Sequence, residues 1–471
     1  MPGNTLSARG RLRQSAAAMP HATPLIAETR RILALAWPVM ITSLNWNIMQ
    51  ITDVALLGLI SPGEVAALGA SRALTLVIIV MAIGAMSGVL VHAARADGAG
   101  DLAASGRVYH ESLALGLALG LIFGALLWLF ADPMLRLIGV APDVVPRGGE
   151  VVRMIAIAFP FQLTLIAASF FLEGLSHPRR VMAINLAMLP CNALLTWALS
   201  GGHLGMPMLG AVGAALGTAL SSVAGAVGLL IAAWHLPEAQ ARGIRNWRRI
   251  ATGATARGAI ALFRFGIAPG IASGLEIMGF SILIALSTQL GNATAHAFQI
   301  VFSVHNLTFA LALGFGSAAG GRVGNAIGEG KRDTVPMRVA IAAGLAAMTT
   351  GAIALLLMGG GSTIVALFPA PEPVHAIAAM VLALWAPFIL FDGVQVVLVY
   401  ALRSLGDQLV AGINSTIAFF GVTTALGLAL VHGAGWGPPA LAIASGAGMV
   451  TSALLNGGRF GWISWRARRQ S

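Results

Sequence analysis

Long runs of hydrophobic residues recur along the whole chain. A helix needs about 20 apolar residues to cross roughly 30 Å of hydrocarbon, at about 1.5 Å per residue. The sequence holds twelve such runs and lacks the alternating segments, each about ten residues long, of a membrane β-barrel. This pattern predicts an all-α polytopic membrane protein with twelve transmembrane helices. The predicted spans are 33–57, 68–93, 110–131, 150–172, 181–199, 209–233, 258–289, 295–318, 337–358, 376–402, 409–431 and 438–458.

The amino-acid composition agrees with a protein that is embedded in a lipid membrane. Hydrophobic residues make up 57% of the 471 and charged residues 10%, and the mean hydropathy is +0.85. A water-soluble globular chain of this length has a far more polar composition. The single cysteine, Cys191, lies in the fifth span, which excludes a disulfide framework and a paired-cysteine metal site.

The basic residues predict the orientation. With a cytoplasmic N-terminus, all but four of the 28 Lys and Arg fall on the inner side of the membrane. We therefore expect both termini in the cytoplasm and the protein in the inner (plasma) membrane. The net charge of +11 is explained by arginines spread over loops beside anionic lipid headgroups, so no nucleic-acid partner is needed. The four exceptions are Arg72, Arg136, Arg147 and Arg153.

The second half of the chain repeats the first at an offset of about 230 residues. The repeat predicts two pseudo-symmetric six-helix bundles: an N-lobe, 33–233, and a C-lobe, 258–460, joined by a basic cytoplasmic linker, 234–257. Cytoplasmic tails, 1–32 and 461–471, flank them. Because six helices return the chain to the same side, both lobes have one orientation, and a cavity between them at mid-depth is the natural substrate site. Matching pairs include Gly84 with Gly314, Ser87 with Ser317, and Gly98 with Gly328.

Three carboxylates interrupt the apolar spans: Asp53, Glu276 and Asp392. In the repeat, Glu276 replaces Asn45 and Asp392 replaces Gln162, so amides of the N-lobe become acids in the C-lobe. A charge at the centre of a membrane helix costs about 2.5 to 3.5 kcal/mol on insertion scales. That cost favours a functional role over a structural one.

Ion pairing is the structural alternative for these acids. Asp53 or Asp392 would pair with Arg72 or Arg153, but those arginines fall toward the outer ends of their spans while the carboxylates lie deeper. We therefore expect unpaired acids and a net acidic interior.

Buried carboxylates can drive ion coupling. Loss of hydration disfavours the charged form of such an acid, and a second carboxylate nearby adds to the effect, so a pair can hold a proton near neutral pH. The same oxygens suit Na⁺, a hard cation. Glu276 and Asp392 are therefore predicted to form one site for H⁺ or Na⁺ within the C-lobe, with Asp53 as a second coupling candidate.

Further polar side chains are candidates to line the cavity, although a hydrogen bond between helices explains any one of them equally well. No P-loop, G-x-S-x-G or H-E-x-x-H motif occurs, so energy from ATP is unsupported and no cofactor is expected. The cavity candidates are Asn45, Gln50, Gln162, Asn192, Thr196, His305 and Asn306.

Several segments resemble the multidrug and toxic compound extrusion (MATE) transporters, in particular the NorM-type branch. They are WPVMITSLNWNIMQITDVALLG, EGLSHPRR, LPCNALLTWALSGGHLGMPMLGAVGAALGT, GLEIMGF and DGVQVVLVYALRSLGD, and the resemblance extends over about 31–460. It implies a two-lobed antiporter that expels cationic amphipathic compounds in exchange for Na⁺ or H⁺. Asp53 then matches the N-lobe acid, Glu276 and Asp392 the C-lobe acids, and Asn192 the fifth-helix asparagine. Thr196 departs from the family, which has Asn or Asp there.

The leading hypothesis is a monomeric cation-coupled exporter with small-molecule cationic substrates and membrane lipids as its partners. The alternative within transport is a flippase for lipid-linked oligosaccharides or peptidoglycan precursors, which is expected to have extra helices and a basic cavity. An intramembrane enzyme would use Asp53, Glu276 or His305 as acid and base, but no paired motif supports it, so we expect no enzymatic activity. A passive channel would not need asymmetric carboxylates.

Overall fold

The computed structural model describes residues 24–470, so residues 1–23 of the predicted tail 1–32 lie outside the described residues. Within this range the regular structure is entirely helical. Twelve helices or broken helices in the described range are long and apolar enough to cross a membrane, which confirms the twelve predicted spans. Helices satisfy their own backbone hydrogen bonds, as a lipid environment requires.

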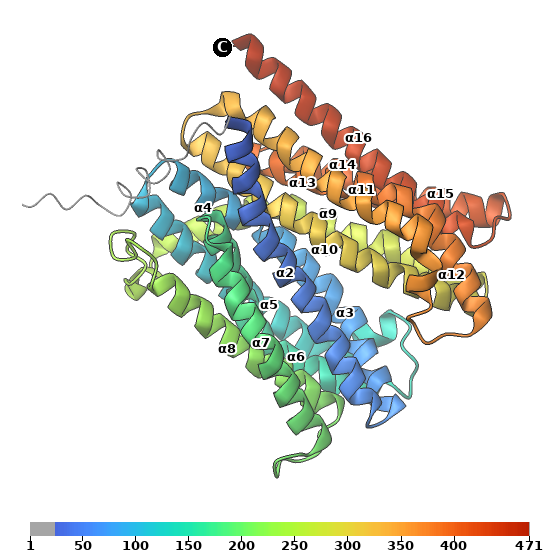
Figure 1. The fold of residues 1–471 in the computed structure, drawn as a ribbon. Coiled ribbons are helices and arrows are strands. Elements are labelled where there is room, and N and C mark those ends of the chain that lie inside the picture. Colours follow the sequence, from blue (N-terminus) through green and yellow to red (C-terminus); the bar gives the residue numbers. More distant parts are fainter. Residues whose placement is uncertain (1–23, 471) are drawn as a thin grey trace, which may run out of the picture.

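The N-lobe contains the first six spans, drawn in blue to green in Figure 1. Its second span is broken at Ser87 into two helices. The connection to the C-lobe contains one short 3₁₀ turn, η1 (Trp247–Arg249). The helices are α2 (Pro24–Gly58), α3 (Pro62–Met86), α4 (Gly88–Gly98), α5 (Leu102–Leu137), α6 (Val145–Gly174), α7 (Pro178–Gly201) and α8 (Ala211–Trp234).

The C-lobe contains the other six spans. Its tenth span is interrupted by a 3₁₀ turn around Pro387, because proline lacks the N–H that continues a helix. Its eleventh span alternates α-helical and π-helical segments. The elements are α9 (Gly253–Gln289), α10 (Asn292–Gly328), η2 (Arg332–Thr334), α11 (Val335–Val365), α12 (Glu372–Trp385), η3 (Ala386–Phe388), α13 (Ile389–Leu405), α14 (Gln408–Ser415), η4 (Thr416–Val422), α15 (Thr423–Leu428), η5 (Ala429–Gly433) and α16 (Pro439–Gln470).

Several predicted boundaries shift. Helix α2 begins at Pro24, inside the predicted tail, and α9 begins at Gly253, inside the predicted linker. Residues 461–470 of the predicted C-terminal tail, 461–471, form the last part of α16. In each case the helix continues beyond the apolar stretch into a polar segment, where hydropathy no longer marks it.

Helix ends follow local signals in the sequence. The Ser61 side chain accepts a hydrogen bond from the Gly63 amide at 3.1 Å, and Pro62 follows at the first helical position of α3. Asp101 caps α5 in the same way, through the amide of Ala104 at 2.8 Å. Gly202, with a φ of 71°, ends α7 in the left-handed conformation that glycine adopts without a steric penalty.

The two lobes pack closely at the end of the molecule where α2 begins. We call this the inner end, because the arginines predict that it faces the cytoplasm. A side chain added at Gly84 would lie 2.7 Å from the Pro269 carbonyl of α9, and one added at Gly314 would lie 2.7 Å from the Ala36 carbonyl of α2. The repeat therefore places matching glycines where the lobes' backbones approach each other. In Figure 1 the lobes meet near the start of α2 and diverge toward the loops after α7 and α11.

Polar contacts also cross between the lobes at the inner end. The Arg322 guanidinium of α10 donates to both carboxylate oxygens of Glu28 on α2, at 2.6 and 2.8 Å. Asn325 donates to the Ala94 carbonyl at 2.8 Å. Arg95 donates to the Ser404 carbonyl at 2.7 Å. These bonds close the inner end of the molecule.

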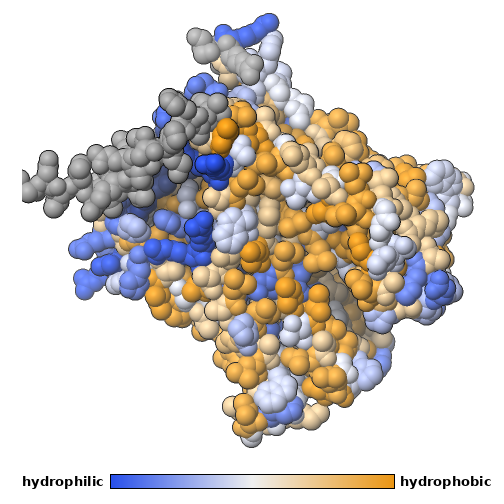
Figure 2. Space-filling model, viewed as in Figure 1, coloured by the Kyte–Doolittle hydropathy of each residue, from blue (hydrophilic) through white to orange (hydrophobic). Residues whose placement is uncertain are grey.

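The surface has the distribution expected of a membrane protein. In Figure 2 hydrophobic residues cover most of the visible face, and hydrophilic residues gather at the inner end. Two arginines at the opposite, outer end are paired with acids: Arg147 with Glu64 at 3.1 Å, and Arg153 with Asp132 at 3.0 Å. Such pairing limits the positive charge on the outer side.

Candidate functional site

A cavity of about 610 Å³ lies between the two lobes, on the outer side of the inner-end contacts. Its walls come from α2, α3, α6 and α8 of the N-lobe and from α9, α10, α13 and α14 of the C-lobe. Five predicted site residues line it: Gln50, Asp53, Gln162, Glu276 and Asn306. Aromatic and aliphatic side chains supply most of the remaining wall, as is typical of sites for small organic molecules.

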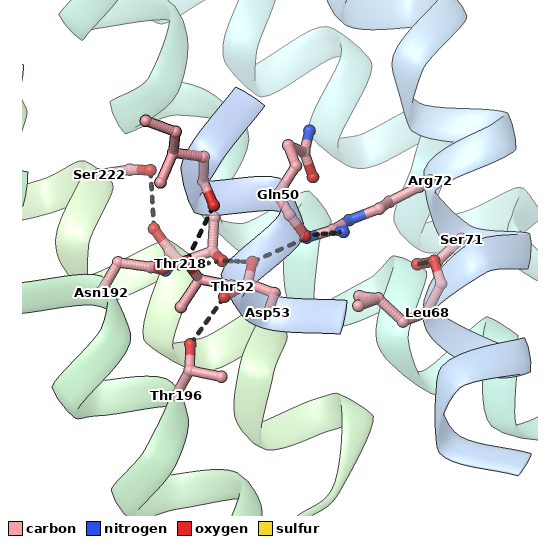
Figure 3. A network of polar contacts seen from close by, with 11 residues as sticks. Gln50, Thr52, Asp53, Leu68, Ser71, Arg72, Asn192, Thr196, Thr218 and Ser222 are labelled. Atoms are coloured by element: carbon pink, nitrogen blue, oxygen red, sulfur yellow. Dashed lines mark hydrogen bonds and ion pairs between the residues drawn. The ribbon is translucent and has the colours of Figure 1, made fainter. Parts of the chain in front are cut away.

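The N-lobe acid, Asp53, is held in a polar network shown in Figure 3. Arg72 of α3 donates to Asp53 Oδ2 at 2.7 Å and to the Gln50 carbonyl at 2.9 Å. Thr196 donates to Asp53 Oδ1 at 3.0 Å, and Thr218 donates to Oδ2 at 3.4 Å. The Asp53 side chain is 3% exposed and that of Arg72 is 23% exposed. The carboxylate is therefore enclosed and matched by a guanidinium.

This ion pair corrects the expectation that Asp53 is unpaired. Helix α3 runs beside α2, and the long arginine side chain reaches the carboxylate from a position nearer the end of its span. The location of a Cα within a span therefore underestimates how deep a guanidinium can lie.

Four other predicted cavity residues lie behind the cavity wall. Asn192 donates to the Thr218 hydroxyl at 3.2 Å, so it supports the Asp53 network from behind, as Thr196 does. Asn45 donates to the Asn185 carbonyl at 2.8 Å and joins α2 to α7. His305 is buried among aromatic rings, with Phe280 at a centroid distance of 5.3 Å.

The two acids of the C-lobe lie at different depths from the cavity. Glu276 lines the cavity, whereas Asp392 is 2% exposed and lies behind Gln395. The Gln395 amide donates to Asp392 Oδ1 at 3.2 Å, and Ser452 donates to Gln395 Oε1 at 3.1 Å. Glu276 and Asp392 are close enough for their charges to interact. Within residues 24–470 neither acid has an arginine at ion-pair distance, in contrast to Asp53.

Two further charged residues were missed by the sequence analysis. Arg403 of α13 lines the cavity near its inner end, within electrostatic reach of Glu276. Glu173 of α6 accepts a hydrogen bond from Ser317 of α10 at 2.7 Å, which adds a bond between the lobes. Both lie at the ends of predicted spans, where a charge is read as part of a loop.

Arg403 also corrects the predicted net acidic interior. The charged residues of the wall are two acids, Asp53 and Glu276, and two arginines, Arg72 and Arg403. Asp392 and Glu173 lie outside the wall, so the cavity surface itself has balanced charges. Among the described residues, no group of three or more His, Cys, Asp or Glu is arranged to hold a metal ion.

Comparison with known proteins gives a consistent result. A sequence model of the MatE family matches the chain twice, at residues 38–198 and 269–429. The two matches confirm the predicted duplication of the chain.

Relatives with similar sequences cover almost the full length. The chain is 29% identical to the probable multidrug resistance protein NorM of Xanthomonas campestris over 457 residues, which are 95% of this chain and 97% of that protein. It is also 29% identical to the multidrug resistance protein PmpM of Pseudomonas aeruginosa, over 86% of this chain and 84% of that protein.

Solved structures share the fold at lower sequence identity. The eukaryotic MATE transporter AtDTX14 superimposes with a TM-score of 0.84 at 19% identity, over 95% of this chain and 99% of that one. An outward-facing MATE-family transporter of the MOP superfamily gives a TM-score of 0.82 at 19% identity, over 94% of this chain and 97% of that one.

Proposed function

Because this chain belongs to the MatE family, we propose that it is a multidrug exporter that expels cationic amphipathic compounds in exchange for H⁺ or Na⁺. Its relatives are named multidrug resistance proteins, and they match nearly the whole chain. The cavity between the lobes is large enough for a small organic molecule and is lined mainly by apolar groups.

The main observation behind the coupling proposal is that Glu276 has no ion-pair partner in the described part of the chain. Its carboxylate lines the cavity, and Asp392 lies behind it. A cationic substrate and a coupling ion both neutralise this carboxylate, so they compete for it. Competition for one site makes the release of substrate depend on the entry of the ion.

Alternating access supplies the second requirement. The inner end is closed by glycine contacts and hydrogen bonds between the lobes, and the cavity lies on their outer side. We propose that the lobes rock against each other, so that these contacts break when the cavity opens inward. The protein would act as a monomer in the inner membrane, with both termini in the cytoplasm.

The flippase alternative has less support. A lipid-linked pyrophosphate favours a basic cavity, but the wall of this cavity contains two acids and two arginines and so has no excess of positive charge.

Dye transport by purified protein in proteoliposomes tests the proposal. A pH gradient and a Na⁺ gradient are imposed separately, and transport of the cationic dye rhodamine 123 is followed by fluorescence. We expect one gradient to drive transport in the wild type and neither to do so in Glu276→Gln or Asp392→Asn. Asn45→Ala, a change at the N-lobe counterpart of Glu276, is the matched control and should have a smaller effect. Wild-type transport by the Glu276 variant would overturn the coupling assignment, and no transport by the wild type would overturn the function.

A further inference from the structure

Arg403 is a buried cation that the coupling proposal does not use. It lies in the last turn of α13, and its side chain lines the cavity. Its Nε is buried and has no hydrogen-bond partner. The guanidinium lies 5.5 Å from the ring centre of Tyr400, a contact that does not neutralise a full charge. An unpaired charge in a membrane protein is costly and marks a functional site.

The other arginine of the cavity is different. Arg72 is bound to Asp53 at 2.7 Å and to a backbone carbonyl, so its donors are already engaged. Arg403 has no carboxylate at ion-pair distance among residues 24–470, although the charge of Glu276 acts on it. Its planar fork of donors is therefore available to an anion that enters the cavity.

The cavity thus contains a free acid and a free guanidinium. Glu276 and Arg403 are near enough to interact but are not in contact as an ion pair. A ligand with both a basic and an acidic group can neutralise both at once, whereas a simple cation leaves Arg403 unpaired.

We propose that Arg403 is an anion subsite, which binds the carboxylate of amphoteric substrates whose basic group is bound at Glu276. The transport role of this subsite rests on the proposed export function, but binding does not. The competing structural explanation is that Arg403 stabilises the C-terminal end of α13, where a positive charge is favourable to the helix dipole.

Two dyes that differ at one group distinguish these explanations. Rhodamine 110 is a zwitterion with a free carboxylate, and rhodamine 123 is its methyl ester, a simple cation. Their affinities for the full chain in lipid nanodiscs are measured by fluorescence polarisation. In the wild type we expect rhodamine 110 to bind at least as tightly as rhodamine 123.

The substitution Arg403→Gln should move the two dyes in opposite directions. Binding of rhodamine 110 should weaken by roughly 10- to 100-fold, the effect of a lost charge-assisted hydrogen bond. Binding of rhodamine 123 should become tighter, because a positive charge has left the cavity. Arg403→Lys keeps the charge without the planar fork and should give an intermediate ratio. Arg136→Gln removes the same charge from an exposed position outside the cavity and is the matched control.

Each other outcome contradicts the proposal. Equal weakening of both dyes in Arg403→Gln would indicate a structural role. If that variant does not fold, the affinities of the wild type test the proposal. Tenfold tighter binding of rhodamine 123 than of rhodamine 110 would overturn the proposed anion subsite but not the proposed export function. Failure of the wild type to bind either dye would overturn the proposed function together with it.

Discussion

Removal of the Glu28 charge should shift the protein toward an inward-open state. Glu28 lies on α2 in the N-lobe and is 7% exposed at its side chain. It accepts hydrogen bonds at 2.6 and 2.8 Å from Arg322 of the C-lobe, and Arg338 Nε lies 3.8 Å from its Oε1. The change Glu28→Gln leaves two arginines without their shared counter-charge while the inner end is closed.

The size of the effect follows from burial. Removal of one partner of a buried ion pair typically costs about 3 to 5 kcal/mol, because the other charge remains unpaired. When the lobes separate, water reaches the arginines and most of this cost is lost. The ratio of open to closed molecules should therefore rise by about two to three orders of magnitude, since about 1.4 kcal/mol corresponds to a factor of ten.

Distances between spin labels at the inner end measure this shift. Labels are attached to cysteines at Ala103 of the N-lobe and Asp333 of the C-lobe, both exposed, after Cys191→Ala removes the single native cysteine. Glu28→Gln should add a population with a longer distance between the labels. Glu150→Gln, at an exposed ion pair of the outer end, serves as the control. An unchanged distance distribution in a folded Glu28→Gln protein would refute the idea that this ion pair holds the inner end closed.

Three further predictions concern other parts of the fold. Gly266→Val should prevent closure of the inner end and abolish transport, because its side chain would overlap the Ala85 carbonyl; normal dye transport would contradict this. Arg72→Gln should lower the free energy of unfolding by about 3 to 5 kcal/mol, because it leaves the Asp53 charge unpaired. Addition of Asp53→Asn to this variant should restore part of the loss. Additive losses in the double mutant would contradict that pairing. Burial, with nearby positive charges, lowers the pKa of His177, so the unfolded state binds its proton more readily and stability falls as the pH drops below about 6.5. Between pH 7.5 and 5.5 the melting temperature of His177→Asn should therefore fall less than that of the wild type. Differential scanning fluorimetry measures both.

Much of the fold could be predicted from the sequence, because lipid imposes few solutions. A segment that crosses the membrane must be a helix of a certain length, so the number of spans can be predicted from hydropathy. The internal repeat then shows which span of the first half corresponds to which span of the second. The matching glycines, such as Gly98 and Gly328, mark backbone contact in both halves: a side chain at either would overlap backbone of the other lobe. Boundaries were less predictable, since α16 continues past its apolar stretch to Gln470.

The site was only partly predictable. Hydropathy gives the position of a residue along a span, but not the direction in which its side chain points or how far that side chain extends from the helix. Glu276 lines the cavity and Asp392 lies behind it, although both are acids within their spans. Arg403 was read as part of a cytoplasmic loop, yet its side chain lines the cavity wall.

The departure at Thr196 acquires a physical explanation in the structure. A neutral hydroxyl there donates to Asp53 Oδ1, while Arg72 supplies the positive charge at Oδ2. The N-lobe acid therefore has a cation within the chain itself. This arrangement supports the proposal that the coupling ion binds in the C-lobe rather than at Asp53.

We propose that substrate and coupling ion compete for the Glu276 carboxylate. Release of ions can be measured when rhodamine 123 is added to purified protein, with protons followed in a weakly buffered solution and Na⁺ followed as a radioactive tracer. We expect the wild type and Asp53→Asn to release one of these ions on binding dye, whereas Glu276→Gln should release neither. Undiminished release from Glu276→Gln, or loss of release in Asp53→Asn alone, would show that Glu276 is not the shared site.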